Sequence, residues 1–525
     1  GLLQWAGMAQ LDGLLSGYFP YSAHLDLKGE EPRLSIESDL QGLAILLPPP
    51  FGKRLDEKVA LRVEATPGQR LVVELADRLR MRWRSLGPAP GQGQGQIWLE
   101  QWPASAQWPG DRGWSVIWRT PRLYLGRWRS TLAALGETFG DSPAPAQTGL
   151  VSQPNAALPA LRRVVIDTDC LHFDQRCLGS LEATASPLAD GWALDIAGTL
   201  MQGQASYRPN QPAPLAIDLA RLNLDMLMPQ PTQMPELAEA IATAPEPKPL
   251  PDWLGKVPDG EIAIDTMLYQ GRRLGPLSAN WQVSPQRLRV APLALTLGEV
   301  TASGELVWEA SGPKASLTRS RLTLSGGDLG SALAALGQPV AIRSATTQVE
   351  SQLAWPGAPW QFALERSRGS IEAVLEDGQF VTLDSPSARL IGLLNVDNLL
   401  RRLRLDFSDV TGEGTAFDSV RGSATLYGGR LETRGPVEID GPSTQFTLEG
   451  SVDLAARRLN MLLGITVPVS QNLPLAAVLV GAPYVGGALF LADKLFGGWL
   501  DKVTRIHYRV RGPWTSPQIT LEDAE

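Results

Sequence analysis

The chain is poor in the residues from which most catalytic and metal sites are built. It has only three histidines, His24, His172 and His507, and two cysteines, Cys170 and Cys177. The chain therefore has too few of these residues to make a zinc site or a Cys–His nucleophile pair a strong expectation. Phosphate-binding glycine loops, H-E-x-x-H and G-x-S-x-G are also missing from usable contexts. We therefore expect no enzyme activity, no catalytic residue, no metal and no cofactor.

A basic surface is lacking as well. The net charge is −8 and the isoelectric point is about 5.3, which argues against a nucleic-acid partner, because such a protein needs a basic face to neutralise phosphates. The 52 glycines and 42 prolines favour many turns over long helices. A chain of 525 residues exceeds the size of one compact core, so several units or an elongated repeat are expected.

The start of the chain, GLLQWAGMAQLDGLL, has neither an initiator methionine nor the basic region of a signal peptide. We expect that residue 1 is not the natural start and that a preceding portion is missing from this sequence.

What the chain does have is period-two alternation. One parity of the segment from Leu71 to Arg84 is apolar and the other carries arginines, and a second such segment lies near the C-terminus. Extended, each segment places its apolar side chains on one face of a sheet. The predicted groove-lining residues are Leu71, Val73, Leu75, Leu79, Met81 and Trp83, with Ile506, Tyr508 and Val510. Less regular alternation covers 262–270, 287–297, 303–309, 371–383, 420–434 and 444–453.

Helical patterns are short and few, at 130–140, 234–244 and 327–338. They are too few to cover a long antiparallel sheet of on the order of 30 strands. Such a sheet must close into a sandwich or barrel, or curl into a trough whose apolar interior holds a guest. An open apolar trough without lipid or another apolar ligand would aggregate.

An internal repeat joins IDTDCLHFDQRCLGSL (166–181) to IDTMLYQGRRLGPL (264–277). Each copy predicts a strand, a tight polar turn and a return strand that opens with Leu-Gly-x-Leu, as expected for an array of β units. Cys170 and Cys177 flank the first tip and can form a disulfide there if the register allows it. We divide the chain into β-groove segments 1–160, 161–250 and 251–384 and a C-terminal region 385–525.

The run from Leu459 to Ala492 has no acidic or basic side chain. Residues 473–492 are long enough to span a bilayer, but prolines and glycines interrupt them and a strand pattern follows directly. We expect an apolar helical segment, 473–498, that caps the sheet, or that caps it and also touches a membrane. The candidate membrane-contact residues are Leu475, Leu479, Val480, Tyr484, Val485, Leu489, Phe490 and Leu491. Deleting 473–492 is expected to abolish binding to liposomes.

Two further clusters have alternative interpretations. Arg401, Arg402 and Arg404 can contact lipid headgroups, or they can pair with the aspartates that follow in an amphipathic turn packed on the sheet. The tryptophans between 98 and 128 can form a carbohydrate-stacking strip or an interfacial belt, although such runs more often pack across strands.

The segments LIGLLNVDNLLRRLRLDFSDVTGEGTAFDSVRG (390–422) and LPLAAVLVGAPYVGGALFLADK (473–494), together with the earlier SDLQGLAILLPPPFGK (38–53), resemble the AsmA-like family in its YhdP branch. The resemblance implies a periplasmic protein, anchored in the inner membrane of a Gram-negative bacterium by a segment absent from this sequence. It implies a repeating β-groove (β-taco) fold of the bridge-like lipid-transfer group, with phospholipid sliding between inner and outer membrane and a role in outer-membrane integrity.

We therefore predict a mostly β protein whose elongated, twisted antiparallel sheet curls into a hydrophobic groove, with short helices and a C-terminal apolar helical cap. The expected partners are phospholipid, the inner and outer membranes and envelope proteins. One alternative is a non-conducting envelope scaffold or assembly factor whose cap docks a protein partner. Another is a polysaccharide-acting β-solenoid enzyme that uses the tryptophan strip.

Overall fold

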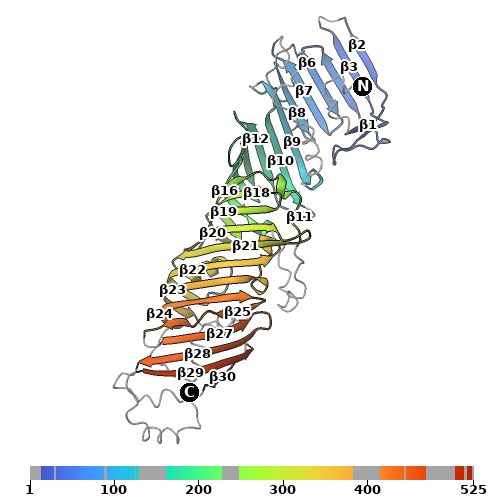
Figure 1. Cartoon of the computed structure of the whole chain (residues 1–525). Helices are drawn as coiled ribbons and strands as arrows, with labels where there is room; N and C mark the ends of the chain where they lie inside the picture. The colour runs from blue at the N-terminus through green and yellow to red at the C-terminus, as the bar shows by residue number, and fades with distance from the viewer. Residues whose placement is uncertain are drawn as a thin grey trace, which may run out of the picture. The chain divides into compact units, whose positions relative to one another are not determined.

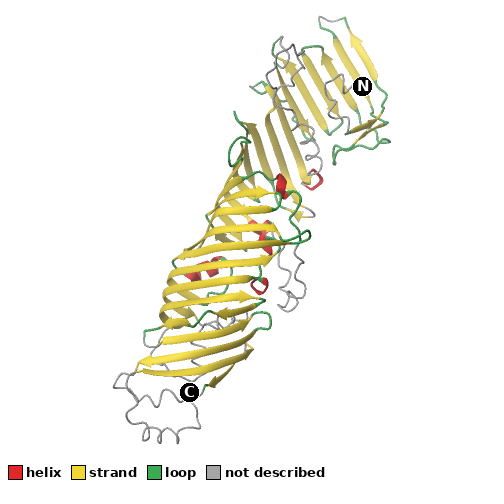
Figure 2. Cartoon of the chain, in the orientation of Figure 1, coloured by secondary structure: helices red, strands yellow, loops and turns green. Residues whose placement is uncertain are grey.

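The computed structural model describes residues 14–28, 31–87, 92–110, 112–124, 126–128, 161–173, 176–227, 248–381, 414–442, 445–468, 503–513 and 517–522. These residues are mostly strands, with a few short helical turns, as predicted (Figures 1 and 2). The chain divides into unit 1, Gly1–Leu227, and unit 2, Met228–Glu525. The helices that the structure describes are all too short or too polar to traverse a bilayer.

Unit 1 is built on a many-stranded sheet (Figure 1). Its strands are β1 (Leu15–Gly17), β2 (Ser22–Asp26), β3 (Arg33–Ser38), β4 (Leu43–Ile45), β5 (Leu61–Thr66), β6 (Arg70–Leu75), β7 (Leu79–Ser85), β8 (Gly93–Leu99), β9 (Gly113–Tyr124), β10 (Leu161–Phe173), β11 (Arg176–Cys177), β12 (Leu181–Pro187), β13 (Trp192–Gly198), β14 (Met201–Tyr207) and β15 (Leu215–Asn223). Spatial neighbours follow chain order from β2 to β15, except that β1 and β4 pair with each other and β11 adds to the end of β10. A short 3-10 helix, η2 (Leu224–Met226), follows β15.

Unit 2 is also built mainly from strands (Figure 2). Its strands are β16 (Gly260–Tyr269), β17 (Arg272–Leu274), β18 (Leu277–Ser284), β19 (Arg287–Leu297), β20 (Val300–Ala310), β21 (Ser316–Gly326), β22 (Ile342–Pro356), β23 (Arg368–Val381), β24 (Gly414–Tyr427), β25 (Arg430–Thr433), β26 (Val437–Asp440), β27 (Gln445–Asp453), β28 (Arg458–Pro468), β29 (Val503–Pro513) and β30 (Gln518–Leu521). Its helices are η3 (Leu254–Lys256), α4 (Leu329–Ala335), η4 (Pro359–Gln361) and η5 (Leu364–Arg366).

The sheet of unit 1 is not wholly antiparallel, which corrects the prediction. β8 pairs in parallel with β9, and β9 pairs in parallel with β10. A parallel neighbour requires the chain to cross back over the sheet before it re-enters. Between β8 and β9, residues 100–110 are part of this crossing, and they cover the polar face of β7 and β8.

The predicted repeat is confirmed. β10 pairs first with the short β11 and then with β12, and β16 pairs in the same way with β17 and β18. In each copy a glycine interrupts the strand that returns along β10 or β16. Gly179 lies between β11 and β12, and Gly275 lies between β17 and β18. Their φ values of 84° and 110° favour glycine. Cys170 and Cys177 form a disulfide at the first tip, with their Cα atoms 5.6 Å apart.

Among the core clusters of the described residues, the most extensive lies in the C-terminal half of unit 2. Fully buried Leu463, Leu426 and Phe380 belong to one cluster that extends from β22 to β29. The predicted helix within 327–338 is confirmed as α4, which packs on β22. Asp328 caps this helix by accepting hydrogen bonds from the amides of Gly330 (2.8 Å) and Ser344 (3.2 Å). A smaller cluster in unit 1 contains Leu123, Leu171, Leu178 and Leu200.

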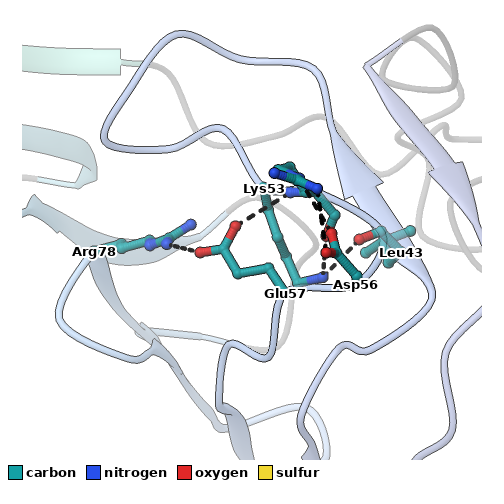
Figure 3. Close-up of polar contacts among 6 residues, drawn as sticks. Leu43, Lys53, Asp56, Glu57 and Arg78 are labelled. Atoms are coloured by element: carbon teal, nitrogen blue, oxygen red, sulfur yellow. Dashed lines mark hydrogen bonds and ion pairs between the residues drawn. The ribbon is translucent and has the colours of Figure 1, made fainter.

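The segment after β4 folds into a hairpin that side chains hold together (Figure 3). Lys53 is only 5% exposed, and its Nζ donates to the carbonyl oxygens of Leu43 (2.7 Å) and Arg54 (2.9 Å). Arg78, just before β7, donates to the carbonyl oxygen of Gly52 (3.0 Å) and to the carboxylate of Glu57 (2.5 Å). These bonds tie the hairpin to the main sheet.

This hairpin should loosen in acid. The hydrogen bond from Arg78, followed by that from the Arg54 amide, lowers the pKa of Glu57 below its ordinary value of 4.5. Because the folded pKa is the lower one, the stabilisation is complete above pH 4.5 and is lost as the pH falls through the folded pKa. We expect the protection of the Ile45 and Lys53 amides against hydrogen exchange to fall over that pH range. In the Glu57→Gln variant, this protection should no longer depend on the titration of residue 57. The same pH response in both proteins would contradict this assignment.

Candidate functional site

The six predicted lining residues of unit 1 come together on one face of β6 and β7. They form three directly opposed cross-strand pairs: Leu71 with Trp83, Val73 with Met81, and Leu75 with Leu79. Residues directly opposite each other in a sheet share a face. All six are partly exposed, so they do not form the solid core of a closed sandwich.

The same face continues onto neighbouring strands. The opposed residues that extend it are Leu34, Ile36, Leu61, Val63 and Ala65 on β3 and β5, Ile97 and Leu99 on β8, and Val116 and Trp118 on β9. All of these side chains are partly exposed too. The strands from β3 to β9 therefore present one continuous apolar surface.

The opposite, polar face is covered in part, across β7 and β8, where Gln94, Gln96 and Trp98 are buried. Arg82 donates through Nε to Oε1 of Gln96 (2.8 Å) and through Nη2 to the carbonyl oxygen of Gln107 (2.7 Å). Its guanidinium carbon lies 4.1 Å from the ring centre of Trp108 and 5.0 Å from that of Trp98. Burial, followed by repulsion from neighbouring arginines, lowers the pKa of Arg82.

On β7 and β8 the two faces thus depart from the usual globular arrangement. In an ordinary one-sided sheet, the apolar face is covered and the polar face meets water. On β7 and β8, residues 107–109 pack over Arg82 and Arg84, while the apolar face stays partly exposed. Among the described residues, the apolar face therefore keeps accessible surface.

The tryptophan-rich segment serves packing. Trp98 and Trp108 contact the guanidinium of Arg82 on the polar face. Trp118 and Trp128 pack edge-to-face with each other at 5.2 Å between ring centres, and both contact the ring of Phe51. For these four residues the packing interpretation is confirmed. The cation–π contact of Trp108 with Arg82 joins residues 26 positions apart, so no local pattern indicates it.

Unit 2 carries a row of apolar residues across its strands. Period-two patterns predict the strands, but they do not predict which residues lie opposite each other. The row crosses β18 to β23, each residue directly opposite the next: Leu277, Leu295, Ala302, Leu324, Val349 and Ala373. All six are partly exposed. Alternating residues on the other face form exposed ion pairs, such as Glu305 with Arg289 (3.0 Å) and Arg321 (3.4 Å). Unit 2 thus has a solvated charged face and an apolar face that runs across strands.

The C-terminal lining residues occupy a different environment. Tyr508 lies opposite Leu463 and Val510 lies opposite Met461, and both are buried, at 8% and 2% exposure. They belong to the large hydrophobic cluster, and burial raises the pKa of the Tyr508 hydroxyl. Ile506 is placed in β29 opposite Ile465, and its side chain is not among those described.

Several predicted contacts lie outside the described residues. They are the headgroup candidates Arg401, Arg402 and Arg404, and the membrane candidates Leu475, Leu479, Val480, Tyr484, Val485, Leu489, Phe490 and Leu491. The apolar segment 473–498 and the helix patterns at 130–140 and 234–244 lie there as well. In the part of the chain that is described, no three His, Cys, Asp or Glu side chains are grouped to hold a metal ion.

A family model and a curated relative both match this chain and both point to the same family. Residues 1–519 match the sequence model of the family described as YhdP protein. The intermembrane phospholipid transporter YhdP of Escherichia coli (strain K12) is 26% identical over 528 aligned residues, which cover 99% of this chain and 38% of that protein. The chain thus spans well under half of that relative. No solved structure matches it.

Proposed function

Because the chain belongs to the YhdP family, we propose that it is a section of a conduit that carries phospholipid between the inner and outer membranes. The observation that carries the proposal is the partly exposed apolar face, seen as the surface from β3 to β9 and as the row from β18 to β23. Phospholipid transport between membranes is the function named for the relative from Escherichia coli.

The spacing of the strands suits a phospholipid that slides along the apolar face. Neighbouring strands lie about 4.8 Å apart, so an apolar row that crosses strands repeats a similar contact every few ångströms. A phospholipid has about 30 methylenes at roughly 0.8 kcal/mol each, so on the order of 25 kcal/mol opposes passage through water. An uninterrupted apolar face removes most of that barrier without a steep minimum that would trap the lipid.

The curling of this face into a groove is part of the proposal, as is a role in outer-membrane integrity. The proposed site is the periplasm, with the complete protein anchored in the inner membrane. The disulfide between Cys170 and Cys177 agrees with an oxidising compartment. The proposed function is not enzymatic and needs no cofactor. Headgroup contact by Arg401, Arg402 and Arg404 and membrane contact by the apolar segment remain predictions.

The direct test is lipid extraction and mass spectrometry on the purified 525-residue chain. We expect stoichiometric phospholipid to survive detergent-free washing, because the partly exposed apolar face should hold acyl chains. A lipid-free, folded and monodisperse protein would overturn the proposal and favour the non-conducting scaffold, since a long empty apolar face should not stay soluble.

A further inference from the structure

A hollow of about 370 Å³ lies on the polar face near the end of unit 2. Four strands, β25, β27, β28 and β29, contribute its lining. The polar lining residues are Arg430, Ser451, Asp453, Arg458, Asn460 and Arg511.

Strand register gathers these side chains. Arg430 and Arg458 lie directly opposite Asp453 on its two sides, along β25, β27 and β28. Two residues away on the same face, Asn460 lies between Ser451 and Arg511. The hollow is therefore a feature of the sheet itself, held by backbone pairing on four strands.

The arginines of the hollow are positioned by neutral groups. Nη2 of Arg430 donates to Oγ of Ser451 (2.7 Å), and Nε of Arg511 donates to Oδ1 of Asn460 (3.0 Å). The carboxylate of Asp453 accepts the amide of Ala456 (2.7 Å) and so caps the turn between β27 and β28. Among the described residues, no carboxylate oxygen forms an ion pair within 4.0 Å of Arg430, Arg458 or Arg511.

Several other arginines on the polar face of unit 2 are ion-paired. Arg319 pairs with Glu309 (3.0 Å), Arg421 pairs with Glu376 (3.7 Å), and Arg509 pairs with Glu522. The hollow instead holds three guanidinium groups and one carboxylate, a net charge of about +2. Like charges on neighbouring strands repel. An anion bound between the three guanidinium groups would reduce this repulsion.

We propose that this hollow binds a phosphate-type anion. Arg430 and Arg511 each keep N–H donors that their neutral partners do not use, because a guanidinium has five. The planar forks of arginine match the oxygens of a phosphate in pairs. The anion can be a soluble phosphate or the phosphate of a lipid headgroup, and the site does not depend on the apolar face.

The test uses the whole 525-residue chain. Inorganic phosphate is titrated calorimetrically in one arm. In the other, the protein is sedimented with vesicles of phosphatidylcholine alone or with added phosphatidylglycerol. The variant is Arg458→Gln/Arg511→Gln. Its control is Arg287→Gln/Arg343→Gln, which makes the same charge change at exposed arginines of β19 and β22 outside the hollow.

We expect the hollow variant to weaken binding about tenfold or more, as charged hydrogen bonds are lost, and the control to leave it unchanged. Loss in the phosphate arm identifies a soluble anion, and loss only with phosphatidylglycerol identifies a headgroup. Asn460→Asp provides a second variant in case the first misfolds, because it keeps the acceptor for Arg511 and adds a competing carboxylate. Equal binding by wild type and both hollow variants in both arms, or an equal loss in the control, would overturn the proposal.

Discussion

Replacing Val73 by aspartate should expel phospholipid from the apolar face of β6 and β7. Val73 lies opposite Met81 near the middle of this face and is partly exposed. Moving an aspartate carboxylate into a lipid-like environment costs about 2.5–3.5 kcal/mol, roughly a hundredfold in local occupancy. The measurement is photocrosslinking from a benzophenone side chain at position 81, with lipid adducts detected by mass spectrometry.

The matched control is Val72→Asp. Val72 is the same residue type on the same strand, but it faces the other side, opposite Arg82. A carboxylate there lies between the guanidinium of Arg82 and the carboxylate of Glu64, away from the apolar face, and should leave the crosslink to lipid intact. If the two variants lose the crosslink equally, or if neither loses it, the apolar face of β6 and β7 is not the lipid path.

Replacing Leu463 by alanine should destabilise the end of unit 2 by about 2–5 kcal/mol. Leu463 has 0% exposure and lies between Leu448 and Tyr508 on neighbouring strands. Removing its side chain leaves a cavity that a sheet paired on both sides can only partly close. The measurement is hydrogen exchange of the amides in β27 to β29, which reports on this region separately from the rest of the chain.

Leu462→Ala supplies the comparison for that prediction. Leu462 lies next to Leu463 on β28 but points to the other face and is partly exposed. Its truncation should cost clearly less. Equal exchange in the two variants would show that the cluster around Leu463 is not the stabilising core of this region.

Much of this architecture follows from local pattern. Alternation over 71–84 specifies strands with one apolar and one basic face, and the repeat at 166–181 and 264–277 specifies two copies of one hairpin. The helix within 327–338 is equally local, because Asp328 caps it and apolar residues follow at helical spacing. Each of these signals depends on residues only a few positions apart.

The arginine hollow and the apolar row of unit 2 could not be read in this way. Arg430, Arg458 and Arg511 are separated by long stretches of chain and meet only because three successive strand pairings bring them onto one face. The row from Leu277 to Ala373 likewise depends on the register of five pairings. A shift of one residue in any of them would move the contributing side chains to the other face.

The two predicted lining segments show most clearly what the sequence determines and what depends on the tertiary structure. By itself the sequence determined that Leu71 to Trp83 and Ile506 to Val510 are strands with one apolar face, because side chains alternate along an extended backbone. Only the tertiary structure decided that Val73 and Met81 stay partly exposed while Tyr508 and Val510 are buried. It also decided that residues 107–109 pack over Arg82 and Arg84 on the polar side. Alternation fixes which residues share a face, but what covers that face depends on chain segments distant in sequence.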